Sequence, residues 1–144
     1  MSDRSHLFNC FSASALGQQL SKRIAVGSAV SCANVDAAGW AHLAAALRAE
    51  TGCTVVLVTA QLKQQETLQQ DVETWLRLLD VDTPARFYAD WEVLPHEDKL
   101  PHADVLSERL ETLQALADGA APVITVTPAA LMQCTLPPAE IAHR

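Results

Sequence analysis

An almost uninterrupted run of β-branched residues, Cys53–Ala60 (CTVVLVTA), places the strongest constraint on the fold. Such a run is typical of a strand that is buried on both faces, as in a parallel sheet. Residues 61–79 follow with apolar side chains at helical spacing. The side chains expected on the buried face of this helix are Leu62, Leu68, Val72, Trp75, Leu76 and Leu79. A strand followed directly by a long helix favours an α/β fold.

The residues before this unit predict one more strand between two helices. Ala13, Leu16 and Leu20 have helical spacing and predict a short helix over 12–21. Ile24–Cys32 alternates β-formers with small residues and predicts a first strand. Asp36 is the expected N-cap of a helix over 37–50, which Gly52 ends. Its apolar face should carry Trp40, Leu43, Ala44 and Leu47.

Two further strands are expected after the long helix, over Arg86–Ala89 and Val123–Thr127. Between them, a helix should begin at His102 or Asp104, run to about Asp118 and be closed by Gly119. Its inward side chains would be Leu106, Leu110, Leu113 and Leu116. Leu131 and Met132 should begin a short helix, which Pro137-Pro138 would break. The predicted fold is thus a parallel sheet flanked by helices.

Composition excludes several classes of function. The net charge is −7 with a pI of about 5.0, and the densest basic group is Lys22-Arg23, which is expected to be a solvated surface pair. Tight DNA binding by this chain alone is therefore not expected. No two of the four cysteines have CxxC spacing, and no secretory signal or membrane span is recognisable. We expect a cytoplasmic location with free thiols.

In parallel sheets, ligands bind at the carboxyl ends of the strands, so the turn after the first predicted strand is where a phosphate loop would lie. A working loop reads GxxxxGK[ST], with a lysine on the phosphate oxygens. This chain has Gly27-Ser28-Ala29 and later Asp36 and Gly39, and no lysine follows either glycine. Nucleotide hydrolysis by this chain is therefore not expected.

The segment from Trp91 to Leu113 holds side chains that could bind a divalent metal. They are His96, Glu97, Asp98, His102 and Asp104. The two histidines are six positions apart across two prolines, so a structural interpretation is simpler. In that interpretation Asp104 caps the following helix, His102 supports its start, and Glu97 and Asp98 are loop charges. Ser107, Glu108 and Arg109 are expected on a helix surface with a Glu–Arg pair.

Covalent catalysis finds little support in the sequence. There is no G-x-S-x-G motif, and Cys32 and Cys53 are expected to be small core residues rather than nucleophiles. Trp40 and Trp75 lie on predicted apolar helix faces and are expected in the core. Trp91 stands beside a loop, where it could cover the sheet edge or line a surface groove.

One block of residues resembles a known family. Trp91-Glu92-x-Leu94-Pro95, then Pro101-His102-x-Asp104 and Ser107-x-Arg109-Leu110, is similar to the N-terminal module of bacterial transcription-repair coupling factors. The downstream segment from Val123 to Gln133 is similar to that family's next strand and its P-x-x-L-M-Q helix. The resemblance covers about residues 16–138.

The resemblance implies a UvrB-like, RecA-like helicase fold whose phosphate loop is degenerate, with Gly27, Ser28 and Ala29 at its position. It implies no catalytic, metal or cofactor site in this chain, because the family's ATP-driven motor lies far downstream. The whole family protein displaces stalled RNA polymerase and recruits the A subunit of the excision nuclease. Recruitment would use an adjacent domain that is absent here, and DNA and RNA polymerase would be contacted only by the full-length protein.

Three hypotheses follow from the sequence. The first is a non-catalytic scaffold domain of a DNA-repair ATPase, with a flexible segment over 1–15, the α/β domain over 16–138 and a linker over 139–144. The alternatives are a metal-dependent enzyme that uses the His96–Asp104 region, or a stand-alone protein-interaction module.

Overall fold

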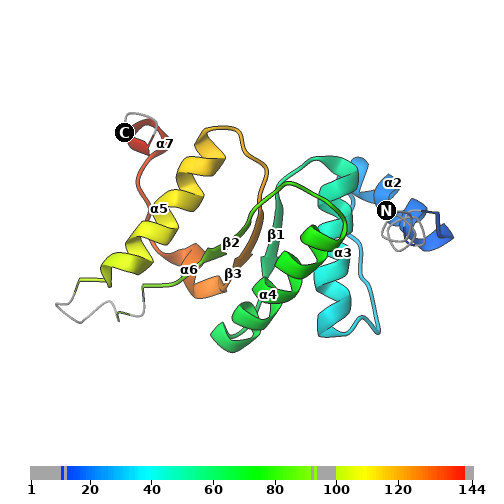
Figure 1. Ribbon diagram of the computed structural model, residues 1–144, viewed down its shortest axis with the longest axis horizontal. Helices are drawn as coiled ribbons and strands as arrows, with labels where there is room; N and C mark the ends of the chain where they lie inside the picture. Colours follow the sequence, from blue (N-terminus) through cyan, green and yellow to red (C-terminus); the bar gives the residue numbers. More distant parts are fainter. Residues whose placement is uncertain (1–10, 12, 92, 94–99, 142–144) are drawn as a thin grey trace.

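Three parallel strands form the sheet at the centre of the molecule (Figure 1). The computed structural model describes residues 11, 13–91, 93 and 100–141. The strand order is β1-β3-β2, with the last strand in sequence between the other two. The strands are β1 (Val55–Val58), β2 (Ala85–Tyr88) and β3 (Val123–Val126). The α/β class with a parallel sheet flanked by helices, predicted from the sequence, is confirmed.

Helices α3 (Ala37–Thr51) and α4 (Leu62–Leu78) pack on each other and on one face of the sheet (Figure 1). Their core combines Ala41, Ala44 and Ala45 with Val72 and Leu76, below Val123 of the central strand. The other face is covered by α5 (Ala103–Ala117), which packs on β2. A second, smaller core lies there, made of Tyr88, Ile124, Val126 and Ala130 with Leu113 against it.

The ends of the helices largely follow the local signals. The Asp36 carboxylate accepts a hydrogen bond from the Gly39 N–H at 2.7 Å, so Asp36 is the N-cap of α3 as predicted. Gly52 ends the same helix with φ of 69°, a left-handed conformation that favours glycine. Helix α4 matches the prediction within one residue at each end.

The predicted first strand is wrong. Ile24 and Ala25 end helix α2 (Ala15–Ala25), and the residues that follow, up to Asp36, contain no strand. Ser14 caps α2 by accepting the Gly17 N–H, so the helix begins later and ends later than residues 12–21. The segment after Ala25 is rich in Gly, Ser and Ala, whose small side chains offer little apolar surface for a sheet to bury.

Burial on both faces was predicted for the strand in Cys53–Ala60. The structure shows it instead for β3, in which all four residues are buried. Strand β1 lies at the sheet edge, and Val56 and Val58 are 50% and 56% exposed. Both strands are rich in β-branched residues, VVLV in β1 and VITV in β3, so composition does not distinguish a central from an edge strand.

Helix α5 begins one residue after His102, whose Nδ1 accepts the Asp104 N–H. Asp104 is in the first turn rather than at the cap. Leu110 and Leu113 are partly buried, but Leu106 and Leu116 are exposed, contrary to prediction. The fully buried positions of α5 are instead Arg109 and Thr112.

The chain beyond β3 forms two short helices, α6 (Pro128–Met132) and α7 (Pro138–Ile141). Leu131 and Met132 therefore end a helix rather than begin one, and Pro138 starts a helix, as proline at a first helical position does. Ile141 is buried and α7 packs on α5. The predicted division into residues 1–15, 16–138 and 139–144 stays a prediction. Helix α2 begins at Ala15, and α7 spans Pro138–Ile141.

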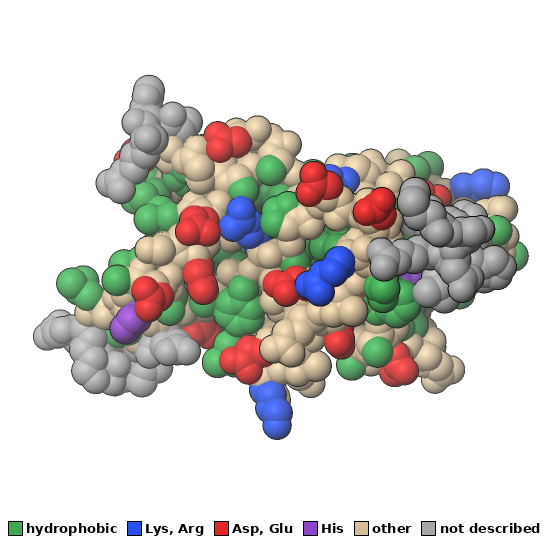
Figure 2. Space-filling view, in the orientation of Figure 1, with side chains coloured by type: hydrophobic (Ala, Val, Ile, Leu, Met, Phe, Trp, Pro, Cys, Tyr) green, Lys and Arg blue, Asp and Glu red, His purple; other side chains and the backbone are tan. Residues whose placement is uncertain are grey.

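Acidic side chains are spread over the face seen in Figure 2, and Lys and Arg do not gather there. Within the described part of the chain, no helix has the length and hydropathy needed to cross a membrane.

Candidate functional site

The residues that follow β2 and β3 meet at the carboxyl ends of these strands, beside α5 and α6. In parallel sheets this is the edge at which ligands usually bind. Four side chains converge there, which we call the Arg109 cluster: Tyr88, Trp91, Arg109 and Gln133. They come from β2, the segment after it, α5 and the segment after α6.

Arg109 is 3% exposed and holds this edge together. Its Nη1 donates to the Ala89 carbonyl at 2.7 Å and to Gln133 Oε1 at 3.2 Å. Nη1 and Nη2 also lie 3.5 Å from the carbonyl of Ala130. The guanidinium group therefore joins the ends of β2 and β3, because these acceptors belong to the segments that follow the two strands.

Two aromatic rings face the same guanidinium group. The Arg109 Cζ atom lies 4.2 Å from the centre of the Tyr88 ring and 5.3 Å from that of Trp91. Both distances fall within the range of a cation–π attraction. Gln133 completes the arrangement, since its Oε1 also accepts the backbone N–H of Trp91 at 3.0 Å.

In the Arg109 cluster, burial and nearby polar or charged groups shift the pKa values in opposite directions. Burial lowers the pKa of Arg109 below its ordinary value, and the nearby Tyr88 hydroxyl and Asp90 carboxylate partly offset this. Burial likewise raises the pKa of Tyr88, against the attraction of Arg109. Arginine has so high a starting pKa that it stays charged, so the cluster holds a buried cation.

A buried glutamine supports the cluster from the opposite face of the sheet. Gln65 of α4 is 0% exposed, and its Nε2 donates to the carbonyls of Thr125 and Tyr88 at 2.9 and 3.1 Å. The Thr125 hydroxyl donates in turn to Gln69 Oε1. Gln65 was not predicted to be buried, although it lies three positions from both Leu62 and Leu68, which were expected on the buried face.

The Arg109 cluster has the chemistry of a structural centre. Its cation donates to carbonyl and amide oxygens of the protein and is nearly inaccessible to solvent. Cationic donors that are already satisfied within the fold hold local backbone in place rather than await a ligand. The geometry therefore fixes the position of Trp91 near the carboxyl end of β2.

The block that carries the family resemblance thus divides into two groups. Trp91 and Arg109 meet in the Arg109 cluster, whereas His102, Asp104 and Ser107 are exposed along the start of α5. Pro101 and Leu110 are partly buried. Glu92, Leu94 and Pro95 lie outside the described residues, so their predicted place in the block stays a prediction.

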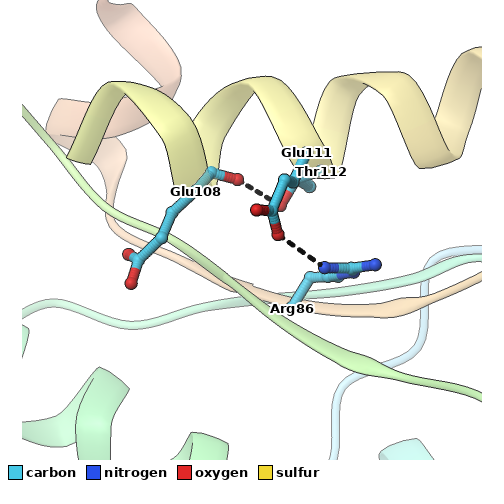
Figure 3. Close-up of polar contacts among 4 residues, drawn as sticks. All are labelled: Arg86, Glu108, Glu111 and Thr112. Carbon is cyan, nitrogen blue, oxygen red and sulfur yellow. Dashed lines mark hydrogen bonds and ion pairs between the residues drawn. The ribbon is translucent and has the colours of Figure 1, made fainter. Parts of the chain in front are cut away.

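The predicted Glu–Arg pair on the surface of α5 is wrong for Arg109, because this side chain points into the fold. Glu108 is exposed as predicted, and its backbone carbonyl accepts the Thr112 hydroxyl (Figure 3). A different pair lies on this side of the sheet: Arg86 of β2 contacts Glu111 at 3.2 Å. Arg109 has the helical spacing of Leu106 and Leu113, and this was the available signal for its burial.

The proposed phosphate-loop position is not at a strand end. Gly27, Ser28 and Ala29 follow helix α2 and are exposed, and Gly27 has φ of 71°. A side chain at Gly27 would meet no atom within 4 Å. These three residues therefore show no close-packed cradle of the kind that a phosphate loop needs.

The predicted metal ligands are only partly described. Among the described residues, no group of three His, Cys, Asp or Glu side chains could hold an ion. His102 Nδ1 and Asp104 Oδ2 are 3.3 Å apart on an exposed surface. His96, Glu97 and Asp98 lie outside the described residues.

Cys32, Cys53 and Trp40 are less buried than predicted. Cys53 is exposed rather than in the core, and Cys32 is half-buried in the segment before α3. Trp40 is 37% exposed, whereas Trp75 is partly buried and packs on the His42 ring at 4.4 Å. Trp40 therefore lies at the margin of the core, because the sheet does not extend beyond β1 to cover it.

Comparison with known proteins finds a similarity to a curated DNA-repair protein. The transcription-repair-coupling factor of Escherichia coli (strain K12) is 31% identical over 97 residues, which cover 60% of this chain. The chain spans 8% of the length of that relative. No family model matches the sequence. The match supports a relationship to transcription-repair coupling factor.

Proposed function

We propose that this chain is the UvrB-like N-terminal domain of a bacterial transcription-repair coupling factor. In this role it is a non-catalytic scaffold with a helicase-like, RecA-like origin and a degenerate phosphate loop. The observation that carries the proposal is the agreement between the family resemblance and the geometry. Trp91 and Arg109 of the block that resembles the family, and Gln133 of the downstream segment that also resembles it, meet with Tyr88 in the Arg109 cluster.

The absence of a phosphate site in the expected place supports the non-catalytic part of the proposal. A triphosphate needs a cation and a ring of backbone N–H groups at the start of a helix. The buried cation of this fold, Arg109, already donates to protein oxygens. In the full-length protein, ATP would bind to the distant C-terminal motor.

The partners proposed for the domain follow from this role. It would contact other domains of the same polypeptide, and the A subunit of the excision nuclease through an adjacent domain. DNA and RNA polymerase would be reached only through the full-length protein. This is consistent with a net charge of −7, which disfavours contact with nucleic acid. Its place of action would be the cytoplasm.

A chimera tests the proposed function. Residues 13–141 replace the matching segment of the E. coli coupling factor in cells that lack their own copy, and repair of transcribed and untranscribed strands is compared after ultraviolet damage. We expect the chimera to restore faster repair of the transcribed strand. The same chimera with Arg109→Met should lose this effect, and the matched surface variant Arg86→Met should retain it.

The proposal would be rejected by a chimera that accumulates to the normal level, retains its ATPase activity and still repairs both strands at equal rates. Normal accumulation and ATPase activity separate this result from a failure to fold.

A further inference from the structure

A cavity of about 420 Å³ lies between helix α2 and helix α3, on the outer side of α3 (Figure 1). One face of each helix lines it, because the contributing residues have helical spacing. They are Leu16, Gln19, Leu20 and Arg23 of α2 and Gly39, His42 and Leu43 of α3. The segment that joins the two helices forms a third wall with Val30, Cys32 and Val35. Small-molecule sites typically have volumes of about 300–1,000 Å³, so the cavity is large enough for a ligand.

One end of this cavity is closed by a turn before α2. The Ser14 hydroxyl donates to the Phe11 carbonyl at 2.6 Å and accepts the Gly17 N–H at 3.0 Å. A side chain at Gly17 would clash with the same carbonyl oxygen, so the turn needs glycine there. The turn places Phe11 against His42, with the ring centres 5.9 Å apart. The wall is therefore held by specific hydrogen bonds and by a residue type that the contact requires.

His42 contributes a polar atom that nothing in the described part of the chain satisfies. Its Nε2 is buried and has no hydrogen-bond partner. Buried polar atoms in folded proteins are normally hydrogen-bonded. A water molecule in this place would need two or more polar partners, whereas most residues that line the cavity are apolar. Burial also lowers the pKa of His42, so the ring is neutral at neutral pH and offers a hydrogen bond without a charge.

Arg23 gives the cavity its charge. It is the one Lys, Arg, Asp or Glu among the described residues that line the cavity. It makes no ion pair with another described residue, and its exposed side chain is free to turn across the opening. The groove beside α5 differs, because Arg86 is accompanied there by Glu111 and Asp118. An unpaired cation at an apolar cavity complements a ligand that has an apolar body and one negative charge.

We propose that this cavity binds a small organic acid, with its apolar body against Leu20, Val35 and Leu43 and its carboxylate held between Arg23 and His42 Nε2. Walls on three sides favour a small molecule over a segment of another protein. The site is separate from the Arg109 cluster, and it is an activity beyond the proposed scaffold role that does not depend on that role.

Titration of the 144-residue chain with octanoate tests the proposal, followed by the amide resonances of the described residues. We expect saturable shifts at Gln19, Arg23 and His42, with a Kd below about 1 mM. Two further probes separate the parts of the ligand. Octanol has the same apolar body without a charge, acetate has the charge without the body, and each should bind at least about 10-fold more weakly.

Variants test the two polar contacts. Arg23→Gln should weaken octanoate binding about 10-fold and leave octanol binding unchanged. The matched control is Lys22→Gln, which removes the same charge from the neighbouring residue of α2, outside the cavity lining. His42→Phe keeps a ring between Phe11 and Trp75 but lacks Nε2, and it should also weaken octanoate binding about 10-fold. The thermal midpoint of each variant shows whether it is folded.

Protection of Cys32 provides a measurement that needs no variant. Cys32 lines the cavity and is half-buried, whereas Cys53 and Cys134 are exposed elsewhere. Octanoate should slow the alkylation of Cys32 by iodoacetamide, measured by mass spectrometry of its peptide. Alkylation of Cys53 and Cys134 in the same sample should keep its rate.

Three results would overturn the proposal. The first is the absence of saturable shifts, together with unchanged alkylation of Cys32, up to about 10 mM octanoate. The second is equal binding of octanol and octanoate, which would show that no anion is recognised. The third is an equal loss of binding in Lys22→Gln and Arg23→Gln, which would assign the effect to the general charge of α2. Each of these results leaves the proposed function standing.

Discussion

Arg109 belongs to the block that resembles a known family, and its role in the structure is to hold two strand ends together. The cation is buried because its helix brings it between two strand ends whose carbonyls need donors. Hydrogen bonds to charged groups contribute about 1.5–3 kcal/mol, and leaving buried acceptors unpaired costs a similar amount. The same energetics explain why Trp91 and Gln133 accompany it.

Replacing Arg109 by methionine keeps an unbranched apolar stem in the same position and removes the guanidinium donors. We expect Arg109→Met to lower the free energy of unfolding by about 2–3 kcal/mol, because the oxygens of Ala89 and Gln133 lose their donor. Urea denaturation followed by tryptophan fluorescence measures this. Arg86→Met, which breaks an exposed ion pair with Glu111, should cost less than about 1 kcal/mol. Equal losses for the two variants would contradict the role given to Arg109.

His42 gives the fold a specific pH dependence. Burial lowers its pKa below the ordinary 6.5, so the unfolded chain binds a proton more readily than the folded one. The contribution of His42 to stability is therefore complete above pH 6.5 and declines as the pH falls through 6.5 toward the folded pKa. Its ring packs against Phe11 and Trp75, which help to bury it.

The pH test compares the unfolding free energy at pH 7.5 and pH 5.5. His42→Gln should show a smaller loss of stability on acidification than the wild-type chain. A wild-type-like pH dependence in His42→Gln would show that its protonation is not linked to folding.

At the scale of the elements, local signals predicted helices better than strands. Asp36 and Gly52 bound α3 because capping depends on neighbouring residues, and the period of α4 set its length. The strand expected over Ile24–Cys32 is absent, because a strand also needs a partner and that information is not local. For the same reason, the composition of β1 and β3 could not show which of them is the central strand.

The positions of the strands predict a difference between two valines. Val126→Ala in β3 should lower the free energy of unfolding by about 2 kcal/mol, because it removes buried methyl groups and leaves a cavity. Val56→Ala in β1 should cost about 0.5 kcal/mol or less, since that side chain is half-exposed. Denaturant titration of both variants checks the ranking, and a larger loss for Val56 would place β1 rather than β3 at the centre of the sheet.

At the scale of the whole molecule, the fold class could be predicted because strand and helix periods alternate along the chain. The candidate site could be predicted only in part. The block from Trp91 to Leu110 contains two members of the Arg109 cluster, but the burial of Arg109 depends on Ala89, Ala130 and Gln133, which are distant in sequence. Val56 and Val58 of β1 are exposed because no other described strand lies beside them, and no pattern in the sequence signals this.

The proposed function requires that this α/β domain has no site for a triphosphate. Titration of the 144-residue chain with magnesium ATP, followed by calorimetry and by the amide resonances of residues 27–29, tests it most directly. The account predicts no saturable heat and no shift of these resonances up to about 1 mM ATP. Saturable binding below that concentration, with shifts at Gly27, Ser28 or Ala29, would contradict it.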